Sequence, residues 1–182
     1  MIRPGTNKAT NNDSKFIAIK KQIRTSALSK ASSRNVLDLY SGDGLMWSSF
    51  NLDLHYKIDA DSRYKTDYCG DCVTYLKNTD ISRFGIIDVD SWGSPAKALN
   101  AIFTKEWKGV VVCTFCLPVN INPCKILAID YWGEHVYNSV KKKSILTKGA
   151  DTLLLSYLKK RGINKVYGHL SAKKCYIWFE IK

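Results

Sequence analysis

The chain has 182 residues, of which 45% are hydrophobic and 24% charged, and its formal net charge is +12. This length suits one domain with a full hydrophobic core, and the composition excludes a disordered or fibrous chain. No apolar run reaches the roughly 18 residues of a membrane span, and the N-terminus lacks the apolar core of a signal peptide. We therefore expect a cytoplasmic protein with no membrane partner, with a transit peptide as an alternative for the N-terminus.

The positive charge is concentrated at the two ends of the chain. Residues 1–35 carry a net charge of +7, residues 36–90 carry −5 and residues 91–182 carry +10. A solvated basic surface explains this pattern without a ligand. The alternative is a polyanion partner bound by both ends, with an acidic centre that faces a ligand carrying positive charge.

The cysteines are compatible with free thiols or with a zinc site. Two C-x-x-C pairs are present, Cys69/Cys72 and Cys113/Cys116, and such pairs can bind zinc. In the sheet derived below they belong to strands on opposite sides of the centre. Because that separation prevents them from sharing one ion, we expect no metal site.

The first expected element is a basic amphipathic helix that begins near Asp13 or Ser14. Its apolar residues recur at helical spacing: Phe16, Ile19, Ile23 and Ala27. Lys20, Lys21 and Arg24 are expected on its other faces. These cations are either solvated or in contact with nucleic-acid phosphates.

A buried strand at residues 36–39 carries Asp38 and leads into a tight glycine turn, Ser41-Gly42-Asp43-Gly44. Residues 45–50 can start a helix after the turn. Strand, glycine turn and helix together bring backbone N–H groups close to a nucleotide-like ligand.

Strands and helices then alternate along the chain. Strands are expected at residues 56–61, 66–70, 84–90 and 109–115, helices at 73–77, 95–103 and 151–161, and a terminal hairpin at 165–170 and 175–181. This alternation predicts an α/β doubly wound sheet. Ligands of such sheets bind beyond the carboxyl ends of the strands, and four acids fall there: Asp38, Asp59, Asp71 and Asp90.

These features resemble the class I S-adenosylmethionine-dependent methyltransferases over roughly residues 34–182. Asp38-x-x-x-Gly42-x-Gly44 is similar to the family's first motif, Asp59 to its ribose-binding acid, and Gly70-Asp71 to its pair near the adenine. The resemblance implies a Rossmann-like sheet of about seven strands with a C-terminal antiparallel hairpin, and S-adenosylmethionine as cofactor. The cofactor-binding residues it implies are Asp38, Tyr40, Gly42, Gly44, Asp59, Asp71 and Asp88, where Asp88 is alternatively a hydrogen-bonding group at a strand end.

Physical chemistry agrees with this cofactor. Ribose hydroxyls and adenine need carboxylate acceptors, and a sulfonium prefers an acidic pocket. A dinucleotide oxidoreductase fits less well, because Trp47 stands at the third glycine position of G-x-G-x-x-G.

A narrower resemblance covers residues 84–95, which are similar to the fourth motif of the tRNA guanine N2-dimethyltransferases, Asp-Pro-Phe-Gly-Ser-Pro. Asp90, Trp92 and Gly93-Ser94-Pro95 match this motif, and Ser91 stands where the family has proline. The resemblance implies catalytic roles for Asp90, Ser91 and Trp92. Asp90 and the Ser91 carbonyl would accept the hydrogens of an exocyclic amine, and Trp92 would stack on the base. The alternatives are a helix-capping acid at Asp90 and a core aromatic at Trp92.

The expected function is therefore an S-adenosylmethionine-dependent N-methyltransferase that acts on an exocyclic amine of a nucleic-acid base, RNA rather than DNA. Residues 1–33 form a basic helical extension, 34–182 the methyltransferase domain, and 118–150 a substrate-recognition insertion. The expected phosphate contacts are Lys20, Lys21, Arg24, Lys141, Lys142 and Lys143. A homodimer or a partner protein is a further expectation. The alternatives are a methyltransferase of proteins or small molecules, and a non-catalytic module that binds S-adenosylmethionine or RNA.

Overall fold

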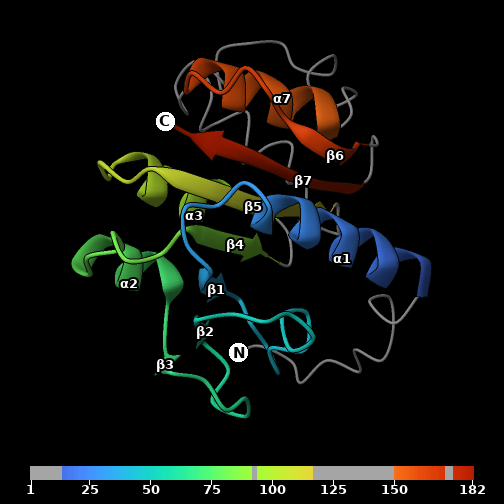
Figure 1. The fold of residues 1–182 in the computed structure, drawn as a ribbon. Coiled ribbons are helices and arrows are strands. Elements are labelled where there is room, and N and C mark those ends of the chain that lie inside the picture. Colours follow the sequence, from blue (N-terminus) through green and yellow to red (C-terminus); the bar gives the residue numbers. More distant parts are fainter. Residues whose placement is uncertain (1–13, 92–93, 117–149, 171–173) are drawn as a thin grey trace, which may run out of the picture.

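A computed structural model describes residues 14–91, 94–116, 150–170 and 174–182. A seven-stranded sheet forms the centre of the fold, in the order β3-β2-β1-β4-β5-β7-β6 (Figure 1). Its strands are β1 (Asn35–Leu39), β2 (Leu54–Asp59), β3 (Tyr68–Cys69), β4 (Ile86–Asp90), β5 (Gly109–Cys116), β6 (Tyr167–Leu170) and β7 (Lys174–Ile181). The helices are α1 (Ser14–Leu28), α2 (Cys72–Asn78), α3 (Ala96–Phe103) and α7 (Ala150–Lys160).

The sheet is parallel from β3 to β5 and antiparallel from β5 through β7 to β6. The predicted doubly wound α/β sheet with a C-terminal antiparallel hairpin is therefore confirmed. The chain runs from β1 outward to β3 and then returns to β4 beside β1. This reversal creates a switch point between β1 and β4, where ligands of such sheets bind.

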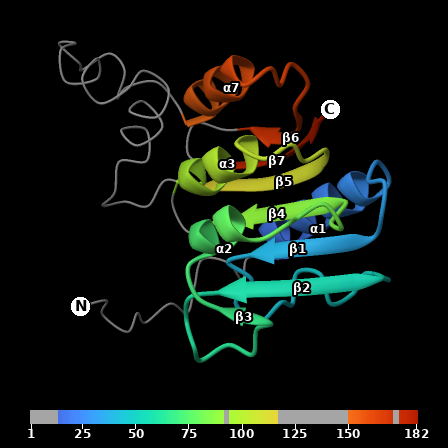
Figure 2. The same ribbon diagram turned by 90° about the vertical axis from the view of Figure 1, so that its left-hand side faces the viewer.

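Helices cover both faces of the sheet, as Figure 2 shows, with α2 and α3 in front of the strands and α1 behind them. Helix α7 packs into the same core cluster as α2 and α3. Strand side chains alternate between the faces, so Leu37 and Ile87 pack in the core under α2, α3 and α7. Val36 and Ile86 pack on the opposite face with Ile23 of α1. The N-terminal helix is thus part of the same packed fold as the sheet.

The segment after the glycine turn differs from our prediction of a helix at residues 45–50. It forms successive turns, in which the backbone N–H of Trp47 donates to the Gly44 carbonyl at 3.3 Å and that of Phe50 to the Trp47 carbonyl at 3.0 Å. Trp47 is buried, and its indole N–H donates to Asp88 at 2.7 Å. We attribute the absence of a regular helix to this fixed side chain and to the short connection to β2.

The other expected elements in the described residues are confirmed, with ends that differ by a few residues. The expected insertion at 118–150 lies almost wholly outside the described residues. Within the described part, no helix is long and apolar enough to cross a membrane.

Candidate functional site

The glycine turn follows β1 at the carboxyl edge of the sheet. Positive φ occurs at two residues of the turn, Gly42 at 55° and Gly44 at 74°, and at Tyr40 just before it, at 63°. Glycine adopts this conformation without the steric cost that a side chain incurs. The turn is closed by a hydrogen bond of 2.8 Å from the Gly44 N–H to the Ser41 carbonyl.

Asp59, at the end of β2, stabilises the glycine turn by hydrogen bonding. One carboxylate oxygen accepts the Gly42 N–H at 2.8 Å, and the other accepts the Asp61 N–H at 2.9 Å. A carboxylate oxygen can accept more than one hydrogen bond, so both retain capacity for a ligand hydroxyl. The structure therefore brings Asp59 and Gly42 together, as the sequence predicts.

Asp71 follows β3 at the same edge and caps α2. Its carboxylate accepts the Thr74 backbone N–H at 2.7 Å and the Thr74 hydroxyl at 2.8 Å, and these bonds lower the pKa of Asp71. The Asp71 side chain is exposed, so it can cap α2 and still contact a ligand.

Tyr40 lies between the turn and α2, where its hydroxyl and the Cys72 thiol share a hydrogen bond. Burial raises the pKa of the Tyr40 hydroxyl, and it raises the pKa of Cys72 to about 11. Cys72 therefore remains a neutral thiol at physiological pH.

Three acids lie on the face of the sheet that α1 covers. Asp88 and Asp90 are two residues apart on β4, and Asp38 is the register partner of Asp88 on β1. Apolar burial of a carboxylate is costly unless it is paired. The structure provides partners for all three, mainly from α1.

Arg24 of α1 is the partner of Asp88. Asp88 Oδ2 accepts from Arg24 Nε at 2.8 Å and lies 2.6 Å from Arg24 Nη2, while Trp47 Nε1 donates to the same oxygen. Asp88 Oδ1 is buried with no hydrogen-bond partner among the described residues. Burial raises the pKa of Asp88 to about 7, against the opposing effect of Arg24.

Asp38 pairs with a different side chain, His55 of β2. The distance from His55 Nε2 to Asp38 Oδ2 is 2.9 Å. Burial raises the pKa of Asp38, and the hydrogen bond from His55 opposes that rise. The motif acid of β1 thus lies under the surface, 3% exposed.

Asp90 ends β4 and is held by Lys20 and Arg24. Lys20 Nζ donates to both carboxylate oxygens, at 2.9 and 2.7 Å, and Arg24 Nη2 donates at 3.1 Å. Burial tends to raise the pKa of Asp90, but the two cations outweigh it and hold the pKa below its ordinary value. The side chain is 15% exposed, so Asp90 is the acid of this face that borders solvent.

These placements correct three expectations. Lys20 and Arg24 are 7% and 1% exposed and pair inside the fold, so in this arrangement they do not present their charges to phosphates. Asp88 is 0% exposed, so in this arrangement its side chain is not accessible to a cofactor. Lys21 is exposed, as a phosphate contact requires. Ser91 is buried next to Asp90; Trp92, Lys141, Lys142 and Lys143 lie outside the described residues.

Sequence reasoning missed the direction of Lys20 and Arg24 and the roles of His55 and Trp47. One signal was available. Phe16, Lys20, Ile23 and Ala27 follow one another at intervals of four, three and four residues, which places Lys20 on the apolar stripe of the helix. Acids inside an apolar strand also need buried partners, such as cations or hydrogen-bond donors, from elsewhere in the fold.

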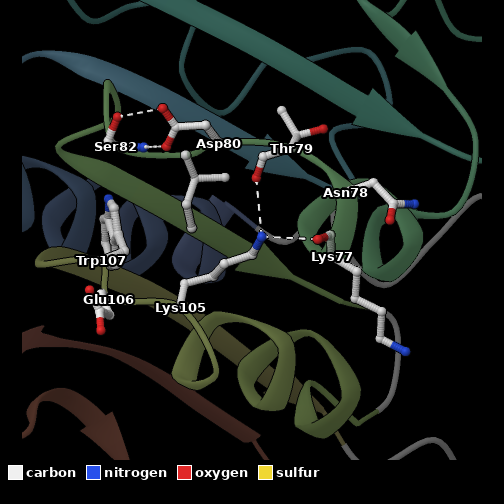
Figure 3. A pocket seen from close by; sticks show the side chains of 9 residues that line it. Lys77, Asn78, Thr79, Asp80, Ser82, Lys105, Glu106 and Trp107 are labelled. Atoms are coloured by element: carbon white, nitrogen blue, oxygen red, sulfur yellow. Dashed lines mark hydrogen bonds between the residues drawn. The ribbon is translucent and has the colours of Figure 1, made fainter.

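No group of three or more His, Cys, Asp or Glu in the described residues could hold a metal ion. A cavity of about 380 Å³ opens at the opposite edge of the sheet (Figure 3). There Lys105 Nζ donates to the Lys77 carbonyl at 3.0 Å and to the Thr79 carbonyl at 3.3 Å. These bonds provide donors for backbone carbonyls at the C-terminal end of α2, which lack partners within the helix. This cavity has a structural explanation and no contact with the glycine turn.

No protein-family profile matches the chain, and no curated protein sequence matches it significantly. Among solved structures, the chain is similar to a SAM-dependent methyltransferase from Archaeoglobus fulgidus. The TM-score is 0.54 and the identity 13%, and the match covers 90% of this chain and 93% of that chain. At this identity, the likeness establishes the fold.

Proposed function

We propose that this chain is an S-adenosylmethionine-dependent methyltransferase whose substrate is an exocyclic amine of an RNA base. The observation that carries the proposal is the hydrogen bond of 2.8 Å between Gly42 and Asp59. It joins the glycine turn of β1 to the acid of β2 beside the switch point, where the fold binds ligands. The similar fold of a SAM-dependent methyltransferase supports the same assignment.

The residues at the turn fit the methyl donor. Ser41 Oγ is buried in the turn with no partner among the described residues, so a polar ligand group can satisfy it. Asp59 keeps acceptor capacity for ribose hydroxyls, and Asp71 lies exposed at the end of the neighbouring strand β3. When bound, S-adenosylmethionine supplies a methyl group on a sulfonium, which nearby carboxylates stabilise.

Asp90 orients the nucleophile in this proposal. A carboxylate accepts through about four lone-pair sites. Lys20 bonds to both oxygens of Asp90, and Arg24 bonds to one of them. An incoming amine therefore binds Asp90 by exchanging with Lys20, while Arg24 keeps the carboxylate in place. The proton that the nitrogen loses on methylation leaves to solvent.

The preference for a nucleic acid rests on charge. The chain carries a net charge of +12, and residues 91–182 contribute +10 of it. Because Lys20 and Arg24 are neutralised inside the fold, phosphate contacts must come from other cations, Lys21 among them.

The test is transfer of a tritiated methyl group from S-adenosylmethionine to separate RNA, DNA and protein fractions by the full chain. We expect label in RNA. Asp90→Asn should lower the rate at least about 100-fold while binding of S-adenosylhomocysteine is retained, and the exposed Asp53→Asn should behave as the unaltered chain. Label in protein alone would show that the substrate is a protein and not RNA. An unchanged rate in Asp90→Asn would show that Asp90 has no role in the reaction.

The pairing of Asp90 with Lys20 favours a second candidate, a module that binds S-adenosylmethionine or RNA without catalysis. In the structure, Lys20 already occupies an acceptor site on each carboxylate oxygen of Asp90. Binding of S-adenosylhomocysteine without transfer to any of the three fractions would establish this alternative.

A further inference from the structure

Strand β6 forms one edge of the sheet, and all four of its residues are exposed. Tyr167 stacks on Trp178 of β7, with ring centroids 4.3 Å apart and planes at 17°, and Tyr167 itself is 44% exposed. His169 lies near Tyr176 on the same face, with centroids 6.4 Å apart. Two exposed rings on the edge strand β6 are thus the cross-strand neighbours of two buried rings on β7.

These rings lie in line with the candidate catalytic acid. Asp90 pairs in register with Thr114, Thr114 with Tyr176, and Tyr176 with His169. His169 is therefore three strands from Asp90, about 14 Å at the usual strand spacing. Tyr176 between them is buried against α1, so a nucleic-acid strand that reaches both residues passes beside the helix, and at about 3.4 Å per stacked nucleotide it needs at least about four nucleotides.

The C-terminal segment that contains β6 is basic in sequence. Residues 159–182 contain seven Lys and Arg and one acid, Glu180, but Arg161 bonds to Asn100 and Lys182 lies 3.7 Å from Glu180. Lys165 is exposed two residues before β6, and Lys174 Nζ at the start of β7 lies 4.1 Å from the centre of the Phe16 ring. An apolar protein surface would match the rings but would not complement the positive charges. A single nucleic-acid strand matches both, because its bases stack and its phosphates pair with cations.

We infer that Tyr167 and His169, with Lys165 and Lys174, form a docking surface for single-stranded RNA about four nucleotides from the target base. This inference rests on the proposed function, since it assigns the partner of the same site. Bases stack on the outer faces of Tyr167 and His169, and the lysines contact the flanking phosphates. The surface holds the substrate strand and does not touch the reacting atoms.

Binding of a fluorescein-labelled 12-nucleotide oligouridine to the full chain, followed by anisotropy, tests this surface. Tyr167→Ala should weaken binding about tenfold, and Tyr167→Phe should retain it because the ring remains. Lys165→Ala should reduce the slope of affinity against salt by about one. Lys77→Ala, which removes an exposed lysine from α2 on the other face, is the matched control and should change little.

Photo-cross-linking of a 4-thiouridine oligomer to the unaltered chain provides a second readout that needs no variant to fold. We expect cross-links on Tyr167 or His169. Cross-links confined to other segments, equal affinity of Tyr167→Ala and Tyr167→Phe, or equal binding of base-free polyphosphate would overturn the surface. Oligouridine-independent self-association through β6, lost in Tyr167→Ala, would identify a second copy as the occupant instead.

The two proposals fail separately. Absence of S-adenosylhomocysteine binding and methyl transfer in the unaltered chain would overturn the proposed function and leave the RNA-binding result standing. Unaltered oligouridine binding by Tyr167→Ala, with methyl transfer to RNA intact, would overturn the docking surface alone.

Discussion

Arg24 of α1 and Asp88 of β4 are joined by an ion pair of 2.6 Å, with side chains that are 1% and 0% exposed. Arg24 also donates to Asp90, so a single guanidinium bonds to both acids at the end of β4. The N-terminal helix is therefore attached to the sheet by buried charge as well as by the apolar contacts of Ile23 and Ala27.

Replacing Arg24 by methionine should destabilise the fold strongly. It leaves Asp88 buried with only the Trp47 indole as a donor among the bonds described above, and breaking a buried pair in this way costs about 3–5 kcal/mol. Urea unfolding monitored by circular dichroism measures this change. Lys21→Met, at a neighbouring exposed position, should change the free energy of unfolding by less than about 0.5 kcal/mol. A loss of similar size in both variants would contradict the importance of the pair.

Stability should also depend on the protonation of Asp88. Its pKa is raised from 3.8 to about 7, so between these pH values the folded chain holds a proton that the unfolded chain has lost. Raising the pH through this window therefore removes stability, by up to about 1.4 kcal/mol per pH unit. The pKa of Asp90 is lowered, so Asp90 acts in the other direction. Its contribution to the free energy of unfolding is lost as the pH falls below the ordinary pKa of an aspartate.

Urea unfolding at several pH values between 4 and 8 isolates the Asp88 effect. The free energy of unfolding of the unaltered chain, relative to that of Asp88→Asn, should fall as the pH rises through this range. Parallel profiles for the two proteins would show that Asp88 does not titrate there.

The doubly wound sheet, its terminal hairpin and the edge at which the acids gather could be predicted from the sequence, because apolar runs, glycine turns and the alternation of strands and helices indicate them. The proximity of Gly42 and Asp59 is an example. The inward direction of Lys20 and Arg24 could not be derived from periodicity alone, since lysine and arginine are normally exposed. Their burial depends on acids that lie more than 60 positions later in the chain.

The turns after Gly44 were mispredicted for a similar reason. Residues 45–50 contain helix-compatible side chains, but the Trp47 indole is fixed by Asp88 from another strand. Local propensity is a weak preference that tertiary contacts override. A buried polar partner at a distance was the information that the local sequence lacked.

Asp59→Ala should weaken the binding of S-adenosylhomocysteine. The substitution removes both the acceptor for ribose hydroxyls and the bond that holds Gly42, and hydrogen bonds to a charged group contribute about 1.5–3 kcal/mol each. Isothermal titration calorimetry should show affinity weakened by roughly 10- to 100-fold. Asp53→Ala is the matched control, because it removes an exposed acid from the same region of the chain. Equal affinities of the two variants would place the ligand elsewhere.

Two glycines offer a matched test of the β6–β7 hairpin. Gly162 and Gly168 both have positive φ, 84° and 132°, but their surroundings differ. A Cβ at Gly162 would meet nothing within 4 Å, whereas one at Gly168 would lie 2.2 Å from the Tyr176 carbonyl oxygen. Gly162→Ala should therefore cost about 1–2 kcal/mol from backbone strain alone, and Gly168→Ala should cost more and separate β6 from β7.

Thermal unfolding, with hydrogen exchange at the β6 amides, distinguishes these two effects. Loss of amide protection confined to β6 in Gly168→Ala would agree with the clash. Equal destabilisation of both variants would contradict it.

Lys20→Met should shift the pH dependence of methyl transfer. Lys20 and Arg24 together lower the pKa of Asp90, so removal of Lys20 should raise that pKa. Asp90 must be deprotonated to accept the hydrogens of an amine, and the acid limb of the initial-rate profile should therefore move to higher pH. Lys20→Arg keeps the charge and should leave the acid limb near its original position, and Lys21→Met should leave it unchanged. If Lys20→Met has the same acid limb as the unaltered chain, the carboxylate that governs the reaction is not Asp90.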